Sequence, residues 1–324
     1  MPTLKDVAKD VGVSVATVSY VLNNSGSVGE AVREKVLAAV ERLNYRPNRQ
    51  AQAMRTGLSR SIGLVLPDLT NPFFPELAQK VENEARSRGI IVILIDTQNC
   101  PEAEKQGLIM LGQQSVDGII WCPVGDTAPS TLKEARCPVV LIDRPIAGFD
   151  VVQSDYRVGG ALAAEHAIAL GHKRVGLLSG PSSVASAVQR RAGFLERASN
   201  NLEVIWDINV PFTTELTDEA RERLRAKDVT MVVAAADLIA VGAMNYLGES
   251  GLKVPQDISL IGFDDIPWAI ILRPKLTTIS QPTAEIGREA VEVLAQRIKD
   301  PQKPVRSVVL EVELKVRDST RSMI

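Results

Sequence analysis

The 324-residue chain has few of the side chains on which metal, disulfide and nucleophile chemistry depends. Its three cysteines are odd in number and have no C-x-x-C spacing, which indicates reduced thiols rather than a disulfide framework. Its only two histidines, His166 and His172, have no metal-ligand companions in the sequence. No GxGxxG or GxxxxGKS/T phosphate motif and no GxSxG nucleophile elbow occurs. We therefore expect no metal, no cofactor and no enzymatic activity.

Long apolar segments are missing as well. No run of 18 apolar residues occurs, and the N-terminus lacks the basic and apolar regions of a secretory signal. The 45% hydrophobic content is nevertheless sufficient for a buried core, although only 4% of the residues are aromatic. These features predict a soluble cytoplasmic protein of two or three domains with no membrane partner.

Charge is distributed unevenly along the chain, although the net charge is only −2. Residues 1–60 contain nine Lys or Arg against five Asp or Glu, whereas the other 264 residues contain 28 against 34. A basic N-terminal segment on an acidic body is typical of a protein whose N-terminus binds a polyanion. The excess is modest, so it favours DNA binding without establishing it.

Residues 3–23 predict two short helices joined by a tight turn. Thr3 can cap the first helix with Asp6 in capping-box position, Gly12 can end it, and Ser14 can cap the second. Two helices with a glycine in the turn are the arrangement that presents a recognition helix to the DNA major groove. The alternative is an ordinary helical hairpin.

A third helix is predicted over residues 27–44, and from Ser61 onward short apolar strands alternate with amphipathic helices. The expected strands are residues 62–68, 90–96, 117–123, 139–145, 174–180, 203–207, 230–235 and 258–264. The expected helices are residues 75–88, 102–115, 157–170, 186–199, 217–226, 238–250 and 284–299. Alternation of this kind predicts the α/β class, with two doubly wound parallel sheets behind a helical head.

Polar residues follow the predicted strands, and parallel sheets bind ligands at the C-terminal ends of their strands. These residues are Asp68, Asn71, Asp143, Arg144, Asp237 and Asp264. Two such sheets facing each other would gather them around one cleft. The sequence therefore predicts a binding cleft rather than a catalytic centre.

Ten segments, in this order and spacing, resemble the LacI/GalR family of bacterial transcription repressors. They are LKDVAKDVGVSVATVS, NYRPN, IGLVLPDLTNPFF, VDGII, LIDRP, GHKRVGLLSGP, RRAGF, VPQDISLIGFDD, LTTISQP and RDST. The resemblance covers essentially the whole chain. It implies a helix-turn-helix head over 1–46, a hinge helix or linker over 47–60, and an effector-binding, dimerising domain over 61–324. Within that domain the resemblance implies two subdomains like those of periplasmic binding proteins, one formed by 61–155 with 282–305 and the other by 156–281 with 306–324.

The resemblance implies that the start of the second helix reads operator DNA. Val15, Ala16 and Tyr20 would face base edges, and Val15 and Ala16 offer only apolar contacts, for instance to a thymine methyl. Phosphates would be held by Thr17, Ser19 and Asn23. The remaining implied DNA contacts are Thr3, Ser14, Asn48, Met54 and Arg55, where Met54 would enter the minor groove from a hinge that forms on DNA. A disordered polar linker is the alternative for residues 49–60.

The cleft resembles that of sugar-binding relatives, including ribose-type periplasmic binding proteins. Ring stacking is implied for the aromatic residues, and hydrogen bonds to hydroxyl groups for the polar ones. The implied effector residues are Asn71, Phe73, Phe74, Asp143, Arg144, Ser186, Arg190, Phe212, Asp264 and Gln281. Ala236 replaces an asparagine common among relatives, which would remove an orienting contact and open space in the cleft for a bulkier or acidic sugar derivative.

These observations predict a cytoplasmic homodimeric repressor of a carbohydrate operon, whose partners are operator DNA and a small sugar or sugar derivative. The effector would act as inducer or corepressor according to the state it prefers. No heptad tail follows RDST, so we expect a dimer rather than a tetramer, with residues 75–88 in its interface. The alternatives are a transport sugar-binding protein, which would have a signal peptide and no helical head, and an enzyme of the same fold, which would need a reactive motif.

Overall fold

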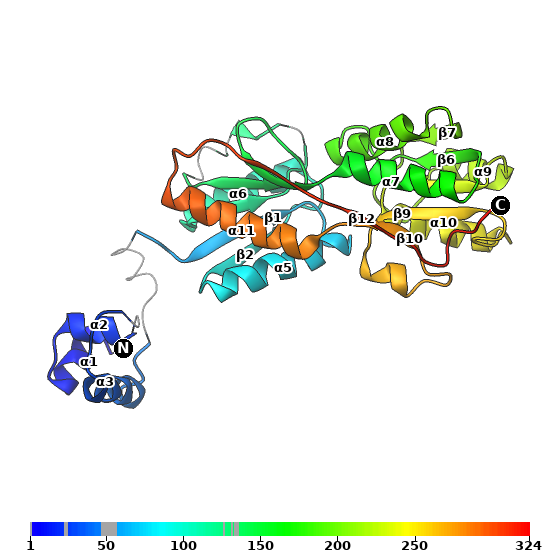
Figure 1. The fold of residues 1–324 in the computed structure, drawn as a ribbon. Helices are drawn as coiled ribbons and strands as arrows, with labels where there is room; N and C mark the ends of the chain where they lie inside the picture. The colour runs from blue at the N-terminus through cyan, green and yellow to red at the C-terminus, as the bar shows by residue number, and fades with distance from the viewer. Residues whose placement is uncertain (1, 23–24, 47–56, 126, 131, 133–135) are drawn as a thin grey trace. The chain divides into compact units, whose positions relative to one another are not determined.

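The structure is a computed structural model that describes residues 2–22, 25–46, 57–125, 127–130, 132 and 136–324. The chain separates into two compact units, a helical head that ends at Ser59 and a larger α/β unit that spans Arg60–Ile324 (Figure 1). No described helix combines the length and the apolar character needed to cross a lipid bilayer.

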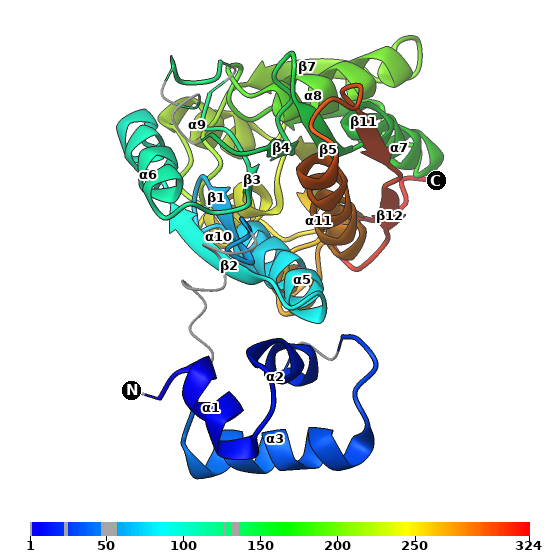
Figure 2. The same cartoon turned by 90° about the vertical axis from the view of Figure 1, so that its left-hand side faces the viewer.

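The described residues of the head form three helices, α1 (Leu4–Val11), α2 (Val15–Leu22) and α3 (Glu30–Arg42) (Figure 2). The predicted capping box is present at the start of α1. The Thr3 side chain accepts a hydrogen bond from the Asp6 N–H, and the Asp6 carboxylate accepts one from the Thr3 N–H at 2.7 Å. The third helix is shorter at both ends than the predicted 27–44.

The turn between α1 and α2 follows from its residues. Gly12 has φ of 74°, in the left-handed region that favours glycine, and its N–H donates to the Ala8 carbonyl at 3.0 Å. Ser14 Oγ accepts from the Thr17 N–H at 3.0 Å and so caps α2 as predicted. The three helices enclose one apolar cluster of buried residues, namely Val7, Ala8, Val18, Val21, Val36, Ala39 and Tyr45. The head therefore has a core of its own.

The larger unit contains two six-stranded sheets. The order in the first is β11 (Ser307–Leu310), β5 (Asp150–Ser154), β4 (Val139–Ile142), β3 (Gly118–Trp121), β1 (Ser61–Leu66) and β2 (Ile91–Asp96). The order in the second is β12 (Glu313–Lys315), β10 (Thr277–Ser280), β9 (Ser259–Asp264), β8 (Met231–Ala234), β6 (Arg174–Leu178) and β7 (Glu203–Ile208). Every pair is parallel except β10 with β12.

Helices cover both faces of each sheet (Figures 1 and 2). On the first sheet, one face carries α5 (Phe73–Ser87) and α11 (Thr283–Lys299), and the other carries α6 (Pro101–Gln113). On the second sheet, one face carries α7 (Tyr156–Ala169) and α8 (Ala185–Ala198), and the other carries α9 (Asp218–Ala226) and α10 (Asp237–Glu249). A short 3-10 helix, η2 (Pro267–Ile270), follows β9. The predicted α/β class with two doubly wound sheets is confirmed.

The last predicted boundary between the two subdomains, between residues 305 and 306, is wrong. The resemblance places residues 306–324 as a whole in the second subdomain, but β11 pairs with β5 in the first sheet. The buried Asp150 carboxylate explains this, because it accepts hydrogen bonds from the Arg306 N–H at 2.8 Å and from the Arg297 guanidinium. The chain therefore crosses to the second sheet only after Leu310.

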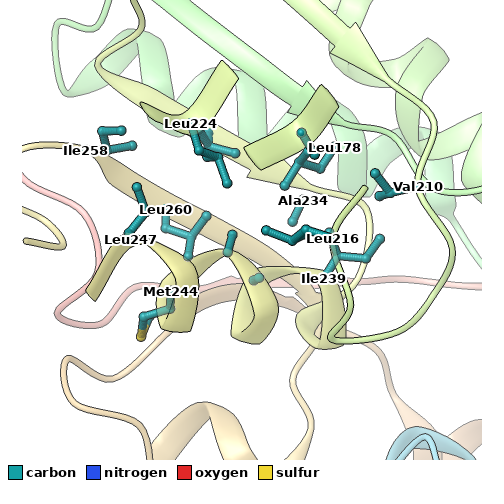
Figure 3. Packing of buried hydrophobic residues seen from close by; sticks show 14 of the residues in the cluster. Leu178, Val210, Leu216, Leu224, Ala234, Ile239, Met244, Leu247, Ile258 and Leu260 are labelled. Atoms are coloured by element: carbon teal, nitrogen blue, oxygen red, sulfur yellow. The ribbon is translucent and has the colours of Figure 1, made fainter. Parts of the chain in front are cut away.

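Each sheet is packed between apolar clusters that fix the positions of its strand ends. Figure 3 shows the cluster between the second sheet and its helices α9 and α10. Leu178 and Leu260 from the strands and Leu224, Ile239 and Leu247 from the helices are all fully buried there. Close packing of this kind leaves a strand little freedom to shift, so loops at the strand ends are held in place.

Both histidines bind the C-terminal segment to the second sheet. His166 on α7 hydrogen-bonds Thr320 Oγ1 through Nε2 at 3.1 Å. His172 lies between Thr230 Oγ1, 2.7 Å from Nδ1, and the Arg321 carbonyl, 3.2 Å from Nε2. Burial lowers the pKa of both imidazoles. For His172 the hydrogen bond with the Arg321 carbonyl opposes this, and the Arg321 and His166 charges add to it.

Lowered histidine pKa values predict a stability that falls in mild acid. As the pH falls, the unfolded chain takes up these protons before the folded protein does, because its histidine pKa values are higher. The neutral histidines therefore contribute fully to the free energy of unfolding above pH 6.5, and this contribution is lost as the pH falls from there through the folded-state pKa values. We expect the Tm of the protein to drop between pH 7.5 and 5.5, and the drop to be smaller in His172→Gln. Scanning calorimetry of wild type and His172→Gln under the same conditions cancels the contributions that the two proteins share. Equal drops in Tm would contradict the prediction.

Candidate functional site

A cavity of about 340 Å³ lies at the C-terminal ends of the strands of both sheets. Its lining residues are Asp68, Asn71, Phe73, Phe74, Asn99, Val124, Asp143, Arg144, Pro181, Ser183, Val184, Ser186, Arg190, Pro211, Phe212, Thr213 and Asp264. Nine of the ten residues that the sequence suggested for the effector are among them. The structure thus brings residues from α5, β9, α8 and the loops that follow β1, β2, β3, β4, β6 and β7 around one space.

Arg190 and Asp264 form a buried ion pair in the wall of this cavity. Their Nη1 and Oδ1 atoms are 3.1 Å apart, and Arg190 Nη1 also donates to the Ala235 carbonyl at 2.5 Å. The guanidinium carbon lies 3.9 Å from the centroid of the Phe263 ring. Burial raises the pKa of Asp264 to about 6, although the Arg190 charge and a hydrogen bond from Gln281 oppose the rise.

A second ion pair, between Asp143 and Arg144, lies on the wall formed by the first sheet. Arg144 Nε is 3.4 Å from Asp143 Oδ2, and Nη1 donates to the carbonyls of Pro123 at 2.7 Å and Val124 at 3.0 Å. The Tyr156 hydroxyl donates to Asp143 Oδ1. Burial, and secondly the Asp143 charge, hold the pKa of Tyr156 well above its usual value, so the phenol stays a donor.

The backbone at both cavity carboxylates is in the left-handed region. Asp143 has φ of 67° and Asp264 has φ of 121°, each directly at the end of a strand. A non-glycine residue held there costs on the order of 1–3 kcal/mol, and such residues concentrate at ligand sites. The Nε atoms of Arg144 and Arg190 are also buried without a hydrogen-bond partner among the described residues. Strain and unused donors therefore coincide at these two pairs.

Three residues singled out from the sequence do not line the cavity. Gln281 lies behind it, where its amide donates to Asp264 Oδ1 at 2.7 Å and accepts from Ser154 Oγ at 2.8 Å. Asp237 is fully buried and accepts from Thr278 Oγ1 and the Ile266 N–H. Ala236 is 1% exposed within the apolar core, so the expected opening of the cleft at this position is wrong.

Sequence reasoning missed several lining residues, which are Asn99, Val124, Pro181, Ser183, Val184, Pro211 and Thr213. All of them lie in the loops that follow β2, β3, β6 and β7. The rule that parallel sheets bind at these ends could have found the loops. It could not say which loop residue turns inward, because that depends on the loop conformation.

The residues suggested for base reading lie on the exposed side of α2. Val15 is 39% exposed, Tyr20 is 50% exposed, and Ala16 is exposed as well. The Tyr20 ring lies against Gly26, where an added Cβ would be 3.1 Å from the ring. The other suggested residues in the described head, Thr3, Ser14, Thr17 and Ser19, lie in or just before α1 and α2. Asn23, Asn48, Met54 and Arg55 fall outside the described residues.

Within the described part of the chain, no group of three or more His, Cys, Asp or Glu side chains is arranged to hold a metal ion. Among the described residues, the candidate functional regions are the cavity and the exposed side of α2.

Two family descriptions match the chain. Residues 3–48 match the model for bacterial regulatory proteins of the lacI family, and residues 164–320 match the model for a periplasmic binding protein-like domain. The first match coincides with the three-helix head. The second includes most of the second sheet and its helices.

Curated relatives match over the full chain. The HTH-type transcriptional repressor PurR of Haemophilus influenzae is 34% identical over 336 residues, covering 100% of both chains. The ribose operon repressor of Halalkalibacterium halodurans is 35% identical over 333 residues, covering 99% of this chain and 98% of the relative. Both relatives are named as repressors.

Solved structures share the fold. A Lac repressor dimer bound to operator and the anti-inducer ONPF superposes with a TM-score of 0.86 at 31% identity, covering 99% of each chain. A LacI family transcriptional regulator from Enterococcus faecium with bound ribose superposes with a TM-score of 0.74 at 29% identity, covering 82% of this chain and 100% of the neighbour.

Proposed function

The chain belongs to the lacI family of bacterial regulatory proteins, and from this premise we propose that it represses a carbohydrate operon under the control of a neutral sugar bound in the cavity. As a member of this family it is a DNA-binding transcriptional regulator with a ligand-binding domain. We propose, beyond this, the class of the ligand, the kind of operator and the residues that bind them.

The observation that carries the sugar proposal is the pairing of charge with aromatic surface in the cavity. Hydroxyl groups both donate and accept, so they can satisfy carboxylates and guanidiniums at once, and charge-assisted hydrogen bonds are the stronger ones. Asp143, Asp264, Arg144 and Arg190 supply both kinds of group. Phe73 and Phe74, which meet edge to face with centroids 5.2 Å apart, supply apolar surface for a sugar ring.

The cavity's charge favours a neutral ligand over a sugar acid or phosphate. Three carboxylates line the cavity, those of Asp68, Asp143 and Asp264, against the two guanidiniums of Arg144 and Arg190. Because the carboxylates outnumber the guanidiniums by one, no unpaired cation is present to attract an anionic ligand, and the remaining carboxylate would repel it. A purine base is the rival ligand. It has no hydroxyl groups, which both donate and accept, so it would leave more of the polar atoms of these two ion pairs without a further hydrogen bond.

We propose that the protein acts as a homodimer on pseudo-palindromic operator DNA, since the two-fold symmetry of a dimer matches such a site. The edge of the first sheet supports a second copy of the chain as the partner. Ile91 and Leu94 on the edge strand β2 are 48% and 43% exposed, and Met110 on α6 is 46% exposed. An apolar edge strand is normally covered. We place β2 in the interface with the neighbouring α5.

A thermal-shift screen tests the ligand proposal. The purified protein is heated with neutral pentoses and hexoses, sugar phosphates, sugar acids and purine bases, because ligand binding raises the Tm by mass action. We expect a neutral sugar to give the largest rise. Stabilisation by a purine base or by an anionic sugar, without a response to any neutral sugar, would overturn the proposal.

Binding of the sugar is expected to weaken in mild acid. Asp264 accepts stronger hydrogen bonds from hydroxyls when it is ionised, and its pKa is raised to about 6, so the weaker-binding protonated fraction grows as the pH falls below that value. If only the ionised form binds, the affinity falls about tenfold at pH 5, one unit below that pKa. Isothermal titration at pH 7.5, 6 and 5 measures this, and an affinity independent of pH would contradict the role of Asp264.

A further inference from the structure

Glu104 is a buried carboxylate outside the cavity that contacts one of the loops lining it. It lies on α6, on the same face as the fully buried Leu108 and Leu111, because residues four and seven apart share a helix face. Glu104 is 4% exposed. A carboxylate in an apolar stripe is costly unless hydrogen-bond donors compensate for the lost water.

Two such donors come from the first sheet and the loop that follows it. Glu104 Oε1 accepts from Trp121 Nε1 at 2.8 Å and from the Val124 N–H at 2.7 Å. Trp121 is itself fully buried at the end of β3. These bonds and the Arg144 charge favour the ionised form, but burial is the larger effect and raises the pKa of Glu104.

The other side of the same loop holds Arg144. Its Nη1 donates to the carbonyls of both Pro123 and Val124, and Val124 and Arg144 both line the cavity. The peptide group between Pro123 and Val124 thus joins the two side chains, because its N–H donates to the Glu104 carboxylate and its carbonyl accepts from the Arg144 guanidinium. Glu104 itself does not line the cavity.

We propose that Glu104 is a positioning residue for ligand binding, which fixes the Pro123–Val124 loop and through its carbonyls holds the Arg144 guanidinium at the cavity wall. The inference rests on the proposed function, because the ligand is the sugar argued for above. At metal sites, residues that orient a ligating group from behind commonly change affinity by about tenfold or more when replaced, and we expect an effect of the same order here.

Three variants test the inference in the full-length protein. Glu104→Met keeps the length of the side chain but offers no acceptor, so the loop loses its anchor. Glu104→Gln keeps one oxygen that can accept both N–H groups. Glu102→Met is the matched control, because Glu102 lies on the same helix and is exposed, with its carboxylate bonded to Gln106.

Titration with D-ribose, the sugar bound in one of the structural neighbours, gives the first readout. We expect Glu104→Met to bind about tenfold more weakly, Glu104→Gln to stay within about threefold of wild type because it retains the acceptor, and Glu102→Met to be unchanged. Equal affinities for wild type and a folded Glu104→Met would overturn the inference. So would a failure of Glu104→Gln to restore binding.

A second readout needs no ligand and therefore separates this inference from the sugar proposal. The Arg144 Nε–Hε signal, assigned by its loss in Arg144→Lys, is followed in two-dimensional nitrogen–proton spectra. We expect it to shift in Glu104→Met and to keep its position in Glu104→Gln. If Glu104→Met does not fold, Trp121→Phe removes one of the two hydrogen bonds and is expected to shift the signal less. An unmoved Arg144 signal overturns the positioning role, whereas a wild type that binds no sugar overturns only the proposed ligand.

Discussion

Asp264→Asn is expected to weaken sugar binding by about 100-fold at pH 7.5. The exchange keeps the size of the side chain but removes the charge from an acceptor, and a hydrogen bond to a charged group contributes about 1.5–3 kcal/mol. It also leaves the Arg190 guanidinium, 3.1 Å away, without its counter-charge. Breaking a buried pair costs about 3–5 kcal/mol of stability, so titrations are run well below the Tm and checked by circular dichroism.

The neighbouring ion pair provides a matched control. Arg191, next to Arg190 in sequence, pairs with Asp207 at 2.5 Å, but Arg191 is 47% exposed and neither residue lines the cavity. Asp207→Asn is therefore expected to leave sugar affinity within about twofold of wild type, since it removes no group that lines the cavity and an ion pair with one exposed partner contributes little. Equal losses in Asp264→Asn and Asp207→Asn would show that the effect is a general loss of stability and not a loss of a ligand contact.

Val18→Asp is expected to abolish specific DNA binding while leaving sugar binding intact. Val18 is fully buried in the core of the head, and an unpaired charge there costs several kcal/mol. A domain of this size has a stability of only about 2–7 kcal/mol, so the head unfolds. Loss of the folded head removes specific binding, which typically exceeds non-specific binding by about 1,000-fold or more. Gel-shift and sugar titrations on the same preparation measure both effects.

Leu37→Asp is the control for this experiment. Leu37 lies on α3 of the same head and is 46% exposed, so the new carboxylate stays in water and the helix keeps its core contacts. We expect DNA binding within a few-fold of wild type. Loss of sugar binding in Val18→Asp would contradict the description of two units with separate cores, and retention of specific DNA binding would contradict the assignment of the head.

The parts of the fold that could be predicted are those specified by local chemistry. Thr3, Gly12 and Ser14 define the head because each satisfies or ends a helix terminus within a few residues. The strands β5, β10, β11 and β12 were missed, since each is short, contains polar residues and lacks the continuous apolar run that marks the predicted strands. Their pairing is decided by neighbours distant in sequence.

The candidate site could be predicted to the level of its charged groups but not of their partners. Asp143 and Asp264 each end a strand, and this position is visible in the sequence. The position of Gln281 behind Asp264 is not visible, because it depends on the crossing of the chain between the two sheets. The burial of Glu104 depends in the same way on the packing of α6 against the face of the first sheet that carries Trp121.

The central claim is that a sugar in the cavity controls the binding of DNA by the head, and one measurement tests it most directly. An operator is first selected from random DNA with the purified protein, and its affinity is then measured with and without the stabilising sugar, for wild type and Asp264→Asn. We expect a pseudo-palindromic operator, a change of about tenfold or more in wild-type affinity when the sugar is added, and almost no change in Asp264→Asn. A change of wild-type operator affinity in either direction agrees with the account. A decrease identifies the sugar as an inducer, and an increase identifies it as a corepressor. An operator affinity that the sugar leaves unchanged in wild type, or changes equally in both proteins, would contradict the account.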